Sequence, residues 1–114
     1  MPKIYLSPST QDWNMYVTGS GSEEYNMNLL ADALVPYLLS NGIQYQRNRP
    51  EMTAGSSIRE ANQGEYDLYL ALHSNAAPEG RYGEERGIIA FYYPGSVGGQ
   101  RAAELIAQEL RKIY

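Results

Sequence analysis

The residues of this chain best suited to chemistry are its one histidine, His73, and a glutamate, Glu24. His73 directly follows the apolar run Leu68-Tyr69-Leu70-Ala71-Leu72. A short apolar run without polar alternation predicts a strand covered on both faces, as in a parallel sheet. Ligands of open α/β sheets bind at the carboxyl ends of such strands. An imidazole at this position can act as a metal ligand or as a general base.

Glu24 falls at the start of the first predicted helix, directly after the first predicted strand and its loop. Parallel strands joined by right-handed crossovers place every strand's carboxyl end, and the start of the following helix, at one edge of the sheet. We therefore expect Glu24 and His73 to share that edge. In a chain without cysteine, a carboxylate and an imidazole fit a zinc site, whose catalytic form has three nitrogen or oxygen ligands and an open position for water. Each residue alone also has a purely structural interpretation, as a helix-start acid and as a hydrogen-bonded histidine.

Two arginines, Arg47 and Arg49, follow the second predicted strand and belong to the same edge. A guanidinium pair at this edge can hold a substrate carboxylate, although a solvated strand end is the simpler interpretation. The polar loop 9–22 also lies there, and loops of this length in compact domains are often functional. Its Gly-Ser-Gly-Ser end, ahead of a helix, weakly suggests a phosphate-binding module, but two glutamates follow and no Gly-Lys-Ser/Thr element is present.

The elements that must position these residues alternate between strands and helices. This order predicts an α/β fold, layered, with a mostly parallel sheet and flanking helices. Pro36 should kink the first helix or end it early, because proline lacks an amide hydrogen and clashes with the preceding turn. The expected strands cover 3–7, 43–47, 68–72 and 88–93, and the expected helices cover 23–40, 53–62 and 100–113.

Composition narrows the possible functions. A length of 114 residues predicts one domain, and a formal net charge of -4 lacks the basic patch that nucleic acids require. The absence of cysteine excludes disulfides and thiolate metal sites. No run approaches the roughly 20 apolar residues of a membrane span, and the first residues have the pattern of a strand rather than of a signal peptide. We expect no nucleic-acid partner and no membrane insertion.

Three segments, 4–9, 24–29 and 70–76, resemble in order and spacing the amidase type 3 family of zinc-dependent N-acetylmuramoyl-L-alanine amidases, which are bacterial and phage cell-wall hydrolases. In that family a glutamate followed by Asn-Leu four and five residues on binds zinc, and this pattern matches Glu24, Asn28 and Leu29. A His-x-Asn-Ala element supplies a histidine ligand, and it matches His73 and Asn75. The resemblance thus implies Zn2+ as cofactor, Glu24 and His73 as ligands, and Asn75 as a substrate-binding residue.

The implied activity is hydrolysis of the amide bond between the muramoyl lactyl group and L-alanine by a zinc-activated water. Peptidoglycan is then the partner, and the substrate implies a location at the cell wall or on the extracellular side. The family's opening motif ends in a histidine ligand that this chain lacks. Asp12 is the nearest carboxylate in that loop and is expected to replace it, because zinc accepts carboxylate oxygen.

The family's catalytic glutamate lies on a strand that would follow Tyr114, so 1–114 is expected to be the N-terminal portion of the catalytic domain. No catalytic base is assigned within the chain. The alternative is a non-catalytic or degenerate cell-wall-binding domain of the same fold, since a fold alone does not determine function.

Overall fold

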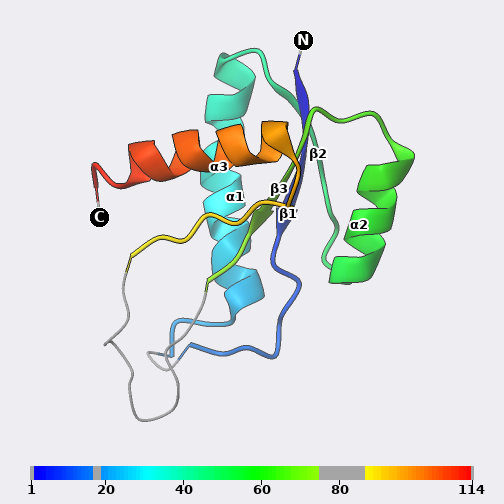
Figure 1. Ribbon diagram of the computed structural model, residues 1–114. Coiled ribbons are helices and arrows are strands. Elements are labelled where there is room, and N and C mark those ends of the chain that lie inside the picture. The colour runs from blue at the N-terminus through cyan, green and yellow to red at the C-terminus, as the bar shows by residue number, and fades with distance from the viewer. Residues whose placement is uncertain (1, 17–18, 75–86, 114) are drawn as a thin grey trace. The chain divides into compact units, whose positions relative to one another are not determined.

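The computed structural model of the protein describes residues 2–16, 19–74 and 87–113. The chain separates into two compact units, Met1–Ser74 and Asn75–Tyr114. The first unit holds the sheet and two helices, and the second holds one helix (Figure 1). In chain order the elements are β1 (Lys3–Pro8), α1 (Glu23–Ser40), β2 (Gln44–Arg47), α2 (Ala54–Gln63), β3 (Leu68–Leu72) and α3 (Val97–Leu110).

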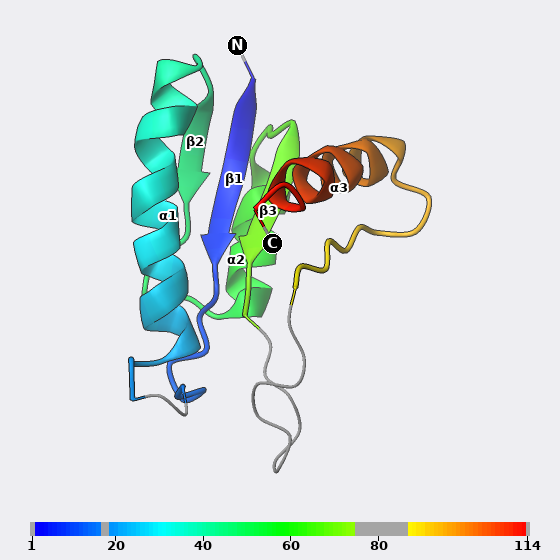
Figure 2. The ribbon, with the colours of Figure 1, turned by 90° about the vertical axis from the view of Figure 1, so that its left-hand side faces the viewer.

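The described strands form a parallel sheet in the order β2-β1-β3, which confirms the predicted α/β class (Figure 2). In the register of this sheet Leu6 of β1 lies between Arg47 of β2 and Leu70 of β3. The carboxyl ends of β1 and β3 coincide, because Pro8 pairs with Leu72. The strand ends therefore meet at one edge, as expected from parallel topology.

Alternation along β1 divides the first unit into two layers around the sheet, with α1 on one face and α2 on the other (Figure 1). Ile4 and Leu6 form the apolar core with Ala31 and Leu38 of α1. Partly buried apolar side chains complete this core, namely Leu34, Val35, Ile43, Tyr45, Leu68, Leu70 and Leu72. Burial of this α1 face supplies the main apolar driving force for folding.

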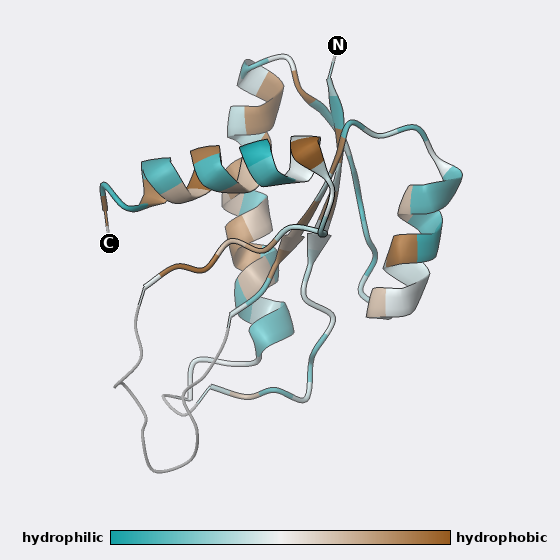
Figure 3. Ribbon diagram, in the orientation of Figure 1, coloured by the Kyte–Doolittle hydropathy of each residue, from teal (hydrophilic) through white to brown (hydrophobic). Residues whose placement is uncertain are grey.

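The opposite face of the sheet is aromatic and polar. Tyr5 of β1 is fully buried, stacks on Tyr69 with ring centroids 5.5 Å apart, and meets Tyr66 edge to face at 5.4 Å. Helix α2, which covers this face, is coloured mainly hydrophilic in Figure 3. The fold thus has one apolar interface and one interface rich in hydrogen bonds.

The prediction that β3 is covered on both faces is wrong. Its three leucines are half-buried toward the core, whereas Tyr69 and Ala71 on the other face are exposed. Among the described strands β3 is at the edge of the sheet and β1 is at its centre. An apolar run therefore indicated a strand correctly but did not reveal its place in the sheet.

Helix α1 begins and ends where its sequence predicts. The Ser22 hydroxyl caps it by accepting a hydrogen bond from the Tyr25 amide at 3.1 Å, and the chain leaves the helix through Gly42 at a φ of 72°. The expected early end at Pro36 is wrong, because the helix continues to Ser40. Packing of Leu38 in the core offsets the missing proline hydrogen bond.

The second unit differs from prediction in one element. Residues 88–93 form no strand, and Ile89, Phe91 and Tyr93 are strongly exposed. A strand needs a hydrogen-bonded neighbour, and the described residues provide none for this segment. Helix α3 begins earlier than predicted because Ser96 caps it by accepting from the Gly99 amide at 3.1 Å. No helix in the described part of the chain combines the length and apolarity needed to cross a membrane.

Candidate functional site

His73 is held by a buried carboxylate at the carboxyl end of β3. Its Nδ1 lies 3.0 Å from Oε2 of Glu23, the first residue of α1. Glu23 is only 2% exposed, whereas the His73 side chain is 48% exposed. The predicted pairing of a helix-start carboxylate with His73 therefore exists, but the carboxylate that makes the contact belongs to Glu23 and not to Glu24.

The loop before α1 fixes the second oxygen of this carboxylate. The Asn14 side-chain amide donates to Glu23 Oε1 at 3.0 Å, and the Asn14 carbonyl accepts from the Glu23 amide at 2.8 Å. Both carboxylate oxygens of Glu23 thus have partners. An engaged and buried carboxylate has little freedom to turn away from His73.

The same loop is also tied to the end of β3. The Tyr16 hydroxyl lies 2.5 Å from the Ser74 hydroxyl, and the Tyr16 amide donates to the Gly21 carbonyl at 2.8 Å. Asn14 and Tyr16 were not predicted as site residues. The only signal for them in the sequence was the length and polarity of the loop that contains them.

The three predicted zinc ligands do not come together. Glu24 lines a separate hollow of about 450 Å³ with Asn28, Asp32 and Arg47. Asp12 lies in the loop after β1, where its amide donates to the Thr10 carbonyl at 3.1 Å. Within residues 2–16, 19–74 and 87–113, no three histidine, aspartate or glutamate side chains gather closely enough to hold a metal ion.

The donor set explains how far these residues suit zinc. A catalytic zinc ion takes three protein ligands, and a ligating histidine commonly donates its other ring N–H to a carboxylate. The Glu23 and His73 contact has this second arrangement and so suits one histidine ligand. The described residues do not supply the complete ligand set.

A hollow of about 380 Å³ opens beside His73. Its walls come from the loop after β1 and from the start of α2. Besides His73, the lining side chains include Thr10, Gln11, Trp13, Met52 and Thr53. The hollow therefore gives small molecules access to the exposed histidine.

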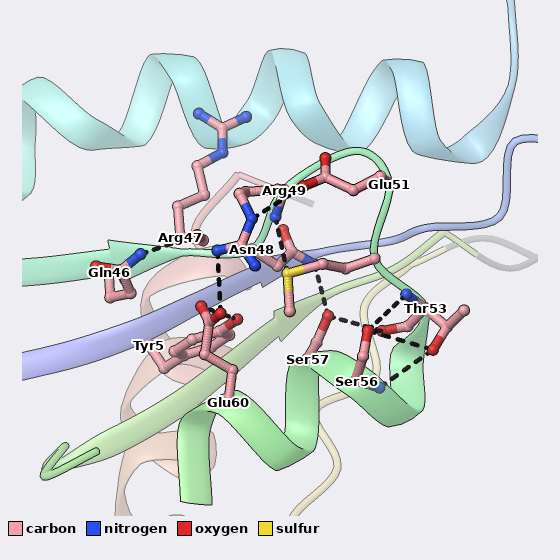
Figure 4. Close-up of polar contacts among 11 residues, drawn as sticks. Tyr5, Gln46, Arg47, Asn48, Arg49, Glu51, Thr53, Ser56, Ser57 and Glu60 are labelled. Carbon is pink, nitrogen blue, oxygen red and sulfur yellow. Dashed lines mark hydrogen bonds and ion pairs between the residues drawn. The ribbon is translucent and has the colours of Figure 1, made fainter. Parts of the chain in front are cut away.

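The two arginines expected to hold a substrate carboxylate face different helices. Arg47 binds Asp32 of α1 at 2.6 Å and also donates to the Asn28 side chain at 2.8 Å. Arg49 binds Glu60 of α2 at 3.0 Å and Glu51 at 2.9 Å. Figure 4 shows them pointing apart. Each guanidinium already has a carboxylate partner, and Asn75, the other expected substrate contact, lies outside the described residues.

Glu60 joins Arg49 to the buried aromatic face. The Tyr5 hydroxyl donates to Glu60 Oε1 at 3.0 Å (Figure 4). Burial, and then this hydrogen bond, raises the pKa of Tyr5 above its ordinary value. The hydrogen bond to Glu60 also raises the pKa of Arg49. This network stabilises the contact between the sheet and α2.

Asn48 joins the end of β2 to β1 and α2 in the same region. Its buried side-chain amide lies 3.2 Å from the Ser7 hydroxyl, 3.1 Å from the Pro8 carbonyl and 3.2 Å from the Ser57 hydroxyl. The Ser57 hydroxyl in turn donates to the Thr53 carbonyl at 2.8 Å. Asn48 thereby anchors the first turn of α2, which forms one wall of the hollow beside His73.

Comparison with protein-family models, with curated proteins and with solved structures finds no match to this chain.

Proposed function

We propose that this chain acts on peptidoglycan as an amidase domain of the type its motifs resemble, with His73 at the centre of the site. The observation that supports this most directly is the contact between the buried Glu23 carboxylate and His73 Nδ1. It lies at the carboxyl edge of a parallel sheet, where α/β proteins bind their ligands.

The chemistry of the pair follows from the nitrogen that Glu23 engages. A carboxylate at Nδ1 favours the imidazole tautomer that carries its proton there and keeps a lone pair on Nε2. Within the described residues, no hydrogen bond or ion pair engages Nε2. Glu23 thus acts as a positioning residue, and His73 presents a nitrogen able to bind a metal ion or accept a proton.

The substrate would be the amide bond between the muramoyl lactyl group and L-alanine. Peptidoglycan lies outside the cytoplasm, so the proposal implies action at the cell wall or on the extracellular side. The proposal assigns roles to His73 and Glu23 alone, because the described residues form no complete zinc set.

A second candidate is a cell-wall-binding domain without catalysis. It is favoured by the separation of Glu24 and Asp12 from His73. Such a domain would keep the fold and the hollow and would bind wall fragments without cleaving them.

Zinc content and wall hydrolysis together test the proposal. The purified full chain is dialysed against zinc at near-neutral pH, and bound metal is measured by mass spectrometry. Release of stem peptide from purified peptidoglycan is followed by chromatography. We expect zinc uptake and release of stem peptide, both lost in His73→Ala. A chain that binds no zinc and releases no peptide would refute the amidase proposal, and retention on insoluble peptidoglycan without cleavage would support the second candidate.

A further inference from the structure

The hollow beside His73 contains an exposed aromatic ring. Trp13 lines the hollow and is 72% exposed, although it is the only tryptophan of the chain. An exposed indole ring is costly in water and is common at binding surfaces. Met52 lines the same hollow and adds a second apolar contact.

The rest of the lining is polar but uncharged. Thr10, Gln11 and Thr53 contribute hydroxyl and amide groups. Among the described residues that line the hollow, none is Asp, Glu, Lys or Arg, and only His73 titrates. Such a lining disfavours strongly charged ligands, because a buried charge needs an opposite charge nearby.

The start of α2 adds hydrogen-bond donors. Ala54 and Gly55 line the hollow, and they occupy the first turn of the helix, directly after its N-cap Thr53. The amides of a first helical turn have no acceptor within the helix. They can therefore donate to a carbonyl or hydroxyl oxygen of a ligand.

From this combination we infer that the hollow binds a neutral N-acetylated sugar ring, with the ring's apolar face against Trp13. A pyranose has one flat C–H face and an edge of hydroxyl groups, which matches an indole surrounded by hydroxyls and amides. The acetamido carbonyl offers the acceptor that first-turn amides lack. A volume of about 380 Å³ falls in the range of small-molecule sites. The inference rests on the proposed function in that the sugar would be part of the glycan chain of peptidoglycan.

The single tryptophan makes binding directly measurable. Triacetylchitotriose is titrated into the full chain in the presence of EDTA while tryptophan fluorescence is recorded. We expect a saturable change in intensity with a shift to shorter wavelength, since the sugar excludes water from the ring. No saturable change, or an equal response to an unrelated dipeptide such as L-alanyl-D-glutamate, would overturn the inference.

Variants are compared by calorimetry, which does not depend on the indole. Trp13→Ala should weaken binding of the trisaccharide about tenfold, and Trp13→Phe should weaken it less. Tyr37→Ala is the matched control, because Tyr37 is 70% exposed on α1 and does not line the hollow. Equal affinity of Trp13→Ala and wild type would contradict the inference, provided that circular dichroism shows both proteins folded.

The two proposals fail separately. Sugar binding in EDTA without any hydrolysis of peptidoglycan would refute the amidase and leave the sugar site standing. Hydrolysis that is equally fast in wild type and Trp13→Ala, with no binding of the trisaccharide, would refute the sugar site and leave the amidase.

Discussion

Glu23 Oε2 lies 3.0 Å from His73 Nδ1, although the two residues are 50 positions apart in the chain. The contact joins the first turn of α1 to the end of β3 across the carboxyl edge of the sheet. It places a buried carboxylate behind an exposed imidazole. The neighbouring Glu24 belongs to a different hollow, so the two adjacent glutamates have different surroundings.

This difference makes the two glutamates a matched pair. Glu23→Gln should weaken zinc binding about 10- to 100-fold, the usual effect of removing a carboxylate partner of a histidine ligand. Glu24→Gln should have a smaller effect. Zinc affinity is measured by competition with a chromophoric chelator, with both variants checked for folding by circular dichroism.

A second measurement reports on the positioning itself. Because the chain has one histidine, the ¹⁵N resonances of its ring are unambiguous. The wild type should show mainly the tautomer protonated at Nδ1, and Glu23→Gln should reduce its share. If Glu24→Gln alone changes zinc affinity and the ring tautomer, Glu23 is not the partner of His73.

Asn48 should be the most sensitive polar position in the first unit. Asn48→Ala removes a buried amide that contacts Ser7, Pro8 and Ser57, and leaves their oxygens without this donor. Loss of stability should be about 1–3 kcal/mol. Urea unfolding measures it, with Gln46→Ala as control because Gln46 is exposed and its amide contacts only the adjacent Arg47 carbonyl. Similar midpoints for the two variants would contradict the role given to Asn48.

Tyr5 should make the protein less stable in alkaline solution. Burial and the hydrogen bond to Glu60 raise the pKa of Tyr5 in the folded state above its ordinary value of 10.0. The folded protein therefore retains a proton that the unfolded chain loses, so the stabilising contribution is complete below the ordinary pKa and declines as the pH rises above it.

The measurement is urea unfolding of wild type and Tyr5→Phe at about pH 8 and about pH 11. The wild type should lose more stability between these values than Tyr5→Phe. The other tyrosines are common to both proteins, so the difference isolates Tyr5. An equal loss in the two proteins would show that the Tyr5 pKa does not govern the alkaline response.

The sequence predicted the elements of the first unit well because their signals are local. Apolar periodicity and the Ser22 cap define α1, and the apolar run before His73 defines β3. The choice between Glu23 and Glu24 was beyond such signals. Adjacent helical residues point about 100° apart, so only packing of α1 against the sheet decides which one faces β3.

Tertiary partners explain the remaining differences. The partners of Arg49 include Glu60, on a helix whose position the sequence pattern did not specify. The segment 88–93 alternates like a strand, but a strand exists only where another strand pairs with it. Long-range pairing was therefore the part of both the site and the fold that local patterns could not provide.

Arg47 should contribute to stability rather than to substrate binding. Its guanidinium contacts Asp32 and Asn28 of α1, and its side chain is 23% exposed. Arg47→Met should lower the free energy of unfolding by about 1 kcal/mol, and a double-mutant cycle with Asp32→Asn should assign at most about 1 kcal/mol to the ion pair, because Asp32 is largely exposed. Urea unfolding measures both. Binding of wall fragments by Arg47→Met should match the wild type, since the guanidinium already has its partners; loss of that binding in a variant of normal stability would restore Arg47 as a substrate contact.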